Sequence, residues 1–200
     1  MRSFSLAVLE GQLEEPVVAK LLTALGLPVG DTRFIVKGSR SAFWRDIQRY
    51  NRAAEHIGPV LGLADLQGFP CPSGLIQKHL PLGKHSNLIV RVAERMLESW
   101  LLADAVSLAN YMRISATRVP KDPDAERYPK QTLVNLASKS PHRELREDMI
   151  PEVGSLGVVG RGYTPRMVEY VERHWRPLAA QNRSQSLRRA IVAIKSATGA

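Results

Sequence analysis

Four short apolar segments, separated by helical patterns, occupy the first 92 residues and limit the folds open to this chain. Amphipathic patterns over 15–25 and 41–56 place apolar residues at steps of three and four, as helices do. Strands that alternate with helices favour a mostly parallel sheet with helices on both faces. We therefore predict an α/β fold with strands at 4–9, 32–37, 60–65 and 87–92.

A long helix over about 93–112 is predicted next, and the pattern then changes. Residues 119–129 are rich in proline and charge, which is typical of a linker or an ordered surface loop. Further helices are predicted near 130–138, 143–149, 165–175 and 184–196, with a glycine-rich loop at 154–162. The chain is thus expected to form an α/β core over 1–112 and a mainly helical extension over 113–200 packed on that core.

The chain is basic, with 28 Lys and Arg against 19 Asp and Glu, a formal charge of +9 and a pI near 10.0. This charge favours polyanion partners such as nucleic acid, although a solubilising surface is the alternative. Cys71 is the single cysteine, which fits a reducing compartment. No apolar run approaches the roughly 20 residues that span a bilayer, and the first residues have no signal-peptide pattern. We expect a cytoplasmic protein with no membrane association.

Two acidic residues, Glu10 and Asp65, stand at the ends of the first and third predicted strands. Ligands of parallel sheets bind outside the carboxyl ends of the strands, so both side chains are expected at one crevice. Carboxylate oxygens suit Mg²⁺, which would activate water and offset charge at a phosphodiester. Gln67 could add a neutral oxygen ligand. Taken singly, Glu10 is also explained as an acid at a helix start and Asp65 as a turn residue.

Glu98 is a third candidate, because it stands in the apolar stretch MLESWLL at 96–102. A carboxylate in such surroundings is costly to bury unless it is paired. It could join the metal site or act as a base. The structural alternative is an ion pair with a buried arginine such as Arg91.

Candidate phosphate contacts are Lys37 and Arg40 after the second strand, and Arg188 and Arg189 in the last helix, although a solvated basic face is the commoner role for such residues. The three tryptophans lie on apolar helical faces and are expected in the core rather than as base-stacking platforms: Trp44, Trp100 and Trp175.

Several blocks of sequence resemble a bacterial domain-of-unknown-function family within the Toprim-like superfamily. They are VLEGQLEE at 8–15, DLQGFPCP at 65–72, RVAERMLESWLLAD at 91–104, Pro129-Lys130, VGRGY at 159–163 and SLRRA at 186–190. The resemblance covers nearly the whole chain, and LESWLLAD is its most specific block.

This resemblance implies a Toprim-type fold, the catalytic module of topoisomerases, primases and overcoming-lysogenisation-defect nucleases. In that module a glutamate after the first strand and an Asp-x-Asp after the third bind Mg²⁺. Glu10 matches the glutamate and Asp65 the first aspartate, whereas Gln67 replaces the second aspartate and removes one negative charge. By analogy, the resemblance also implies an ATPase partner and a role in mobile-element or phage defence.

Three functions follow from these observations. The first is a Mg²⁺- or Mn²⁺-dependent nuclease in which Glu10 and Asp65 bind the metal and Glu98 is an auxiliary acid. The second is a non-catalytic module that binds nucleic acid or an ATPase partner and has a degenerate metal site at Gln67. The third is a protein-binding scaffold built on residues 113–200.

Overall fold

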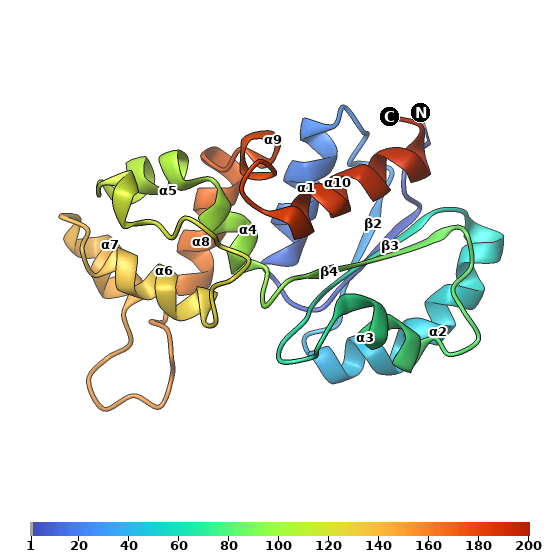
Figure 1. The fold of residues 1–200 in the computed structure, drawn as a ribbon, viewed down its shortest axis with the longest axis horizontal. Coiled ribbons are helices and arrows are strands. Elements are labelled where there is room, and N and C mark those ends of the chain that lie inside the picture. Colours follow the sequence, from blue (N-terminus) through green and yellow to red (C-terminus); the bar gives the residue numbers. More distant parts are fainter. Residues whose placement is uncertain (1) are drawn as a thin grey trace.

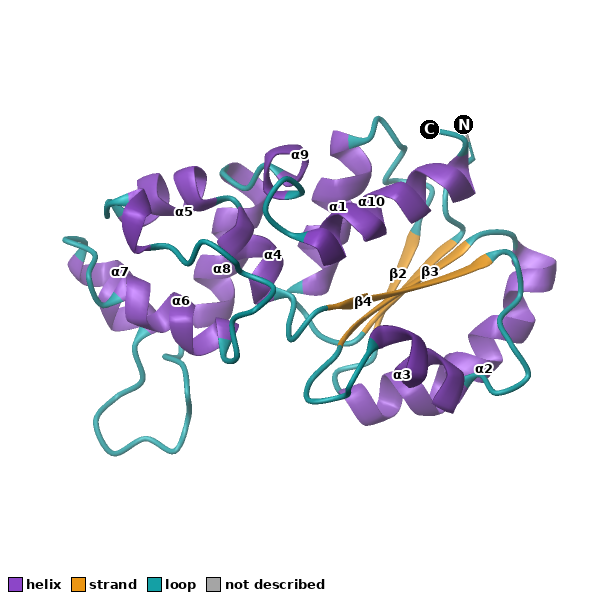
Figure 2. Cartoon of the chain, viewed as in Figure 1, coloured by secondary structure: helices purple, strands orange, loops and turns teal. Residues whose placement is uncertain are grey.

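A computed structural model of the chain describes residues 2–200. Its centre is a four-stranded sheet in the order β2-β1-β3-β4, and every neighbouring pair is parallel (Figure 2). The strands are β1 (Leu6–Leu9), β2 (Arg33–Val36), β3 (Val60–Asp65) and β4 (Leu88–Ala93). The predicted α/β fold is confirmed, and all four strands lie within two residues of their predicted limits.

Both faces of the sheet are covered, which explains why the strands read as continuous apolar runs. In β1, Leu6 and Val8 belong to the apolar cluster on one face, while Ala7 and Leu9 belong to the cluster on the other. All four are at most 6% exposed. Because side chains alternate along a strand, β1 contributes to the apolar clusters on both faces of the sheet.

On one face lie α2 (Arg40–Ile57) and α3 (Pro72–His79) (Figure 1). Helix α2 begins at Ser39, whose hydroxyl accepts a hydrogen bond from the Ala42 amide. A Cβ on Gly62 of β3 would stand 3.3 Å from the Phe43 ring, so the glycine lets α2 approach the sheet closely. Helix α3 is absent from the helices predicted from sequence, and it begins directly after Cys71 with a proline in its first turn.

The opposite face carries α1 (Glu14–Ala24) and α10 (Gln185–Thr198), the last helix of the chain (Figure 1). Helix α10 contacts β4, and α1 contacts α8 and α9. The amide of Arg2 also donates to the carbonyl of Thr198 at 2.8 Å, which places the two ends of the described chain side by side. The C-terminal half therefore completes the sheet's own core.

Beyond β4 the chain is helical. Its elements are α4 (Glu98–Ala103), α5 (Ala105–Met112), the short 3₁₀ helix η1 (Ala116–Arg118), α6 (Pro129–Ala137), α7 (Arg143–Met149), α8 (Tyr163–Arg173) and α9 (Pro177–Ala180). Within residues 2–200, no helix is long and apolar enough to cross a membrane.

The single helix predicted over 93–112 is wrong. The chain turns after β4, forms α4, and breaks at Asp104, whose backbone φ of −87° and ψ of 66° are not helical. The Asp104 carboxylate accepts from the Ser107 amide, which caps α5, and it pairs with both the Nε and Nη2 of Arg176 at 3.0 and 2.6 Å. Local capping and a partner 72 residues away thus override the continuous helical pattern.

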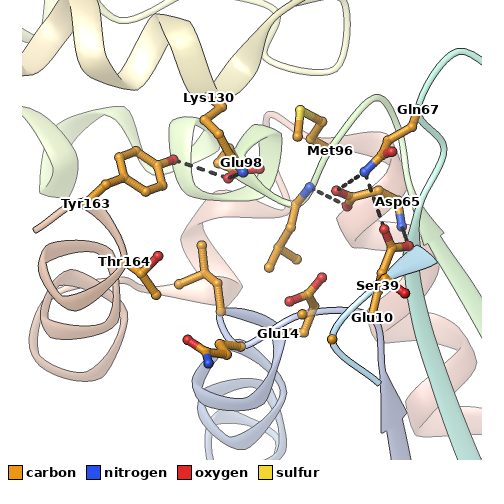
Figure 3. A pocket seen from close by; sticks show the side chains of 15 residues that line it. Glu10, Glu14, Ser39, Asp65, Gln67, Met96, Glu98, Lys130, Tyr163 and Thr164 are labelled. Carbon is orange, nitrogen blue, oxygen red and sulfur yellow. Dashed lines mark hydrogen bonds and ion pairs between the residues drawn. The ribbon is translucent and has the colours of Figure 1, made fainter. Parts of the chain in front are cut away.

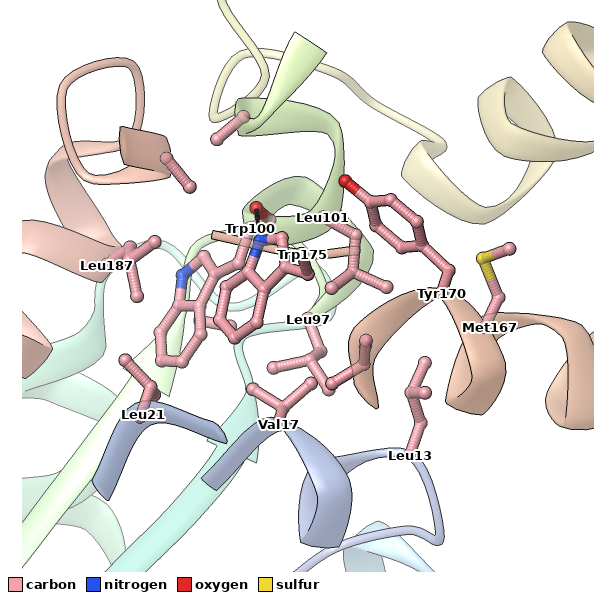
Figure 4. Packing of buried hydrophobic residues seen from close by; sticks show 14 of the residues in the cluster. Leu13, Val17, Leu21, Leu97, Trp100, Leu101, Met167, Tyr170, Trp175 and Leu187 are labelled. Carbon is pink, nitrogen blue, oxygen red and sulfur yellow. Dashed lines mark hydrogen bonds between the residues drawn. The ribbon is translucent and has the colours of Figure 1, made fainter. Parts of the chain in front are cut away.

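The three tryptophans are buried as predicted, each at most 4% exposed. Trp100 and Trp175 lie next to each other where α4 meets the C-terminal helices (Figure 4). The Trp175 indole donates to the Trp100 carbonyl at 3.2 Å, and the Trp100 indole donates to the Ser186 hydroxyl at 2.6 Å. Both polar ends are therefore satisfied inside the core that joins sheet and helices.

Candidate active site

A cavity of about 270 Å³ lies at the carboxyl ends of β1 and β3, where the sheet meets the helical half. Four acidic side chains line it, together with an amide, a lysine and a tyrosine (Figure 3). They are Glu10, Glu14, Asp65, Glu98, Gln67, Lys130 and Tyr163. Three of these residues, Glu10, Asp65 and Glu98, are the acids chosen from sequence, and the structure brings them to one cavity.

Glu10 and Asp65 meet because β1 and β3 are neighbours in the sheet. Leu9, the last residue of β1, pairs with Leu63 of β3. Glu10, which follows β1, and Asp65, the last residue of β3, therefore lie at the same edge of the sheet. The Glu10 carboxylate accepts a hydrogen bond from the Asp65 amide at 3.3 Å. Both side chains are only 7% exposed, and burial raises the pKa of Glu10.

Asp65 is also tied to the turn that precedes α4. Its Oδ1 accepts a hydrogen bond from the Leu97 amide at 2.8 Å, which leaves Oδ2 facing the cavity side chains. Burial raises the pKa of Asp65 well above its usual value, and the charges of Glu98, Glu14 and Glu10 act in the same direction. One carboxylate thus links the sheet to the helical half and contributes to the acidic cluster.

Gln67 lies beside this pair in an unusual conformation. Its φ is 39°, in the left-handed region that few residues other than glycine adopt. Arg40 donates to the carbonyls of Leu66 and Gln67, which holds the turn in place. The Gln67 Nε2 donates to Glu10 at 3.3 Å and to Asp65 at 3.5 Å. The amide nitrogen, rather than the oxygen proposed as a metal ligand, therefore faces the two carboxylates.

Glu98 opens α4 and points into the cavity from the opposite side, where it is 4% exposed. Lys130 of α6 lies 3.4 Å from its Oε1, and the Tyr163 hydroxyl donates to the same atom at 3.2 Å (Figure 3). The ion pair with Arg91 considered from sequence is not formed. The Arg91 Nε has no hydrogen-bond partner within residues 2–200.

The sequence alone does not single out Glu14, because an acid in the first turn of a helix is sufficiently explained by the helix dipole. It is nevertheless 6% exposed and faces the cavity. Burial raises its pKa to about 7, and the charges of Glu10 and Glu98 add to the effect. Its separation of four residues from Glu10, across the turn at Gly11, was the available signal.

The cluster has four carboxyl groups and few neighbouring cations. Among residues 2–200, Lys130 is the one cation within 4.0 Å of any of the four carboxylates. Their oxygen atoms are the donor type that Mg²⁺ and Mn²⁺ prefer, so the donor set fits such an ion. Within the same residues, however, no group of three or more His, Cys, Asp or Glu side chains is placed to hold a metal ion.

The four basic residues proposed to contact phosphates lie in two places. Lys37 pairs with Asp46 at 2.5 Å, and Arg40 holds the turn before α3, both next to the cavity. Arg188 donates to backbone carbonyls near the start of α10, and Arg189 stands 4.0 Å from a glutamate at the end of β4. Their contacts with nucleic acid stay a prediction.

Comparisons with models of protein families, with curated proteins and with solved structures gave no match.

Proposed function

We propose that this protein is a Mg²⁺-dependent enzyme that cleaves phosphodiester bonds in nucleic acid. One observation carries the proposal: four buried carboxylates converge at the carboxyl edge of a parallel sheet, in a chain whose net charge is +9. Burying like charges together is costly and needs compensation by a cation or by protons. A divalent ion that also bridges to substrate phosphate supplies that compensation.

Six cavity residues have a role in this proposal. Glu10 and Asp65 bind the metal, and Glu14 lies where it can contribute a further oxygen. When bound, the ion would activate water and offset charge at the phosphodiester. Lys130 offers a positive charge to the phosphate, while Tyr163 and Lys130 together orient the Glu98 carboxylate.

The resemblance to Toprim-like proteins supports the same assignment. The two positions matched to that family, Glu10 and Asp65, lie on adjacent strands and share a hydrogen bond. A glutamate after the first strand and an aspartate after the third can bind one Mg²⁺ only if they lie close together at one edge of the sheet.

Cutting of single-stranded and duplex DNA and RNA in the presence of Mg²⁺ or Mn²⁺ tests the proposal. Glu10→Gln and Asp65→Asn should reduce cutting to background, while Glu15→Gln should not, because Glu15 is exposed one residue beyond Glu14. Circular dichroism would establish that the variants are folded. Metal-dependent cutting that persists in both cavity variants would refute the assignment.

A second function is favoured by Gln67. Its amide N–H groups occupy the position between Glu10 and Asp65 that the proposed cation would need. A module that has lost metal chemistry would bind nucleic acid, or a partner such as an ATPase, without turnover. Isothermal calorimetry with Mn²⁺ separates the two functions: measurable affinity in the natural protein favours the enzyme, whereas affinity that appears only in Gln67→Asp favours the degenerate module.

A further inference from the structure

A second, open groove of about 810 Å³ adjoins the acidic cavity. It runs between the first turns of α2, the turn after β3, and α3, two helices that lie together under one face of the sheet (Figure 1). Ser39 and Gln67 line both the groove and the acidic cavity. The groove and the acidic cavity are therefore direct neighbours on the molecule.

The charge of the groove is opposite to that of the cavity. Three cations line it, Arg40, Arg45 and Lys78, and no acidic residue does. Arg45 pairs with Asp46, but neither Arg40 nor Lys78 has a carboxylate within 4.0 Å among residues 2–200. The groove thus offers two positive charges that no acid of the described chain neutralises, as a polyanion requires.

Aromatic rings alternate with these cations. The Lys78 ammonium stands 5.2 Å from the centre of the Phe69 ring, and both residues line the groove. His79 stacks on Trp44 with ring centres 4.7 Å apart and planes 23° apart. Trp44 is 4% exposed and supports His79 from the core side, while His79 and Phe69 are only partly buried. Basic side chains interleaved with ring faces are typical of surfaces that bind unpaired bases.

We propose that this groove binds a single-stranded segment of nucleic acid and leads its backbone to the acidic cavity. Bases stack on Phe69 and His79, and phosphates contact Arg40 and Lys78. A duplex hides the faces of its bases, so its contacts with the rings would be lost. An acidic peptide would use the cations but would gain little from the rings. The delivery to the cavity rests on the proposed function, whereas the binding itself does not.

Fluorescence anisotropy in EDTA tests the binding without any cutting. The probes are labelled thymidylate and uridylate strands of about ten nucleotides, a duplex of the same length, and a polyglutamate peptide as competitor. Phe69→Leu keeps apolar volume but removes the ring and should weaken single-strand binding about five-fold or more, whereas Phe69→Tyr should retain it. Lys78→Ala should weaken binding and reduce the salt dependence by about one phosphate contact. Lys139→Ala, an exposed lysine at the end of α6, is the matched control and should change neither.

Three results would overturn the inference. The first is a duplex that binds as tightly as the single strand, and the second is a Phe69→Leu protein that binds the strand as tightly as the natural protein does. The third is displacement of the strand by polyglutamate that carries the same number of negative charges as the strand. The last would identify an acidic protein partner instead. Failure of the proposed function gives a different pattern. In that case the strand still binds in EDTA with the expected variant effects, but neither DNA nor RNA is cut when Mg²⁺ or Mn²⁺ is added.

Discussion

Replacing Glu14 by glutamine should stabilise the protein at alkaline pH. Burial raises the pKa of Glu14 from its usual 4.5 to about 7, so the folded chain holds this proton more tightly than the unfolded chain does. Below pH 4.5 both states are protonated and the carboxyl has no effect on stability. As pH rises from 4.5 to about 7, the unfolded state ionises first and stability falls. Glutamine keeps the shape of the side chain and removes this loss.

The size of the effect follows from the shift in pKa. A shift of this size corresponds to about 3 kcal/mol in the free energy of unfolding, at about 1.4 kcal/mol for each pKa unit. The side chain is 6% exposed, so solvent screens it little. Urea denaturation in EDTA, followed by the fluorescence of the buried Trp100 and Trp175, measures the difference. We expect Glu14→Gln to gain up to about 3 kcal/mol at about pH 8 and almost nothing at about pH 4.

Glu15→Gln is the matched control, since Glu15 is the exposed neighbour in the same first turn of α1. It should change stability little at either pH. A gain in Glu14→Gln that is equal at both pH values would show that the benefit comes from something other than ionisation. No gain at about pH 8 would refute the account of Glu14 as a buried acid that costs stability when it ionises.

Three further changes test the surroundings of the site and the core by urea denaturation. Tyr163→Phe removes the hydrogen bond to Glu98 and should cost about 1 kcal/mol. Lys130→Met leaves the 4% exposed Glu98 without its cation and should cost about 2 kcal/mol at neutral pH, more than Tyr163→Phe does. Gly62→Ala puts a methyl group 3.3 Å from the Phe43 ring and should cost about 1–3 kcal/mol at any pH. A Gly62→Ala protein as stable as the natural one would show that α2 can shift away from the sheet.

The strands were predictable from sequence because burial on both faces leaves runs of apolar residues with distinct ends. The region after β4 was not, because its breaks depend on contacts that the local pattern does not contain. Asp104 reads as one more residue of an amphipathic helix until Arg176 pairs with it. Helix α3 was missed for a related reason: Pro70 and Pro72 indicate a loop, although a proline also fits the first turn of a helix.

The candidate site likewise contains residues that the sequence predicts and residues that it does not. Glu10 and Asp65 could be paired from sequence, because residues at the ends of parallel strands share one edge of the sheet. Lys130 and Tyr163 could not be assigned, since they approach Glu98 from helices 32 and 65 residues further along the chain. Glu14 has an explanation from sequence as an acid at a helix start, and only its burial reveals a second role.

The hydrogen bond from the Leu97 amide to Asp65 gives the site a built-in reporter. This single N–H lies at the turn before α4, and its acceptor is one oxygen of a carboxylate whose other oxygen faces the cavity. Any cation or proton that draws electron density toward the cavity weakens the acceptor. The ¹⁵N resonance of Leu97 and the exchange rate of its amide proton would then change when the site is occupied. Ligand binding could thus be followed in ¹⁵N-enriched protein of the natural sequence, with no fluorophore attached and no turnover required.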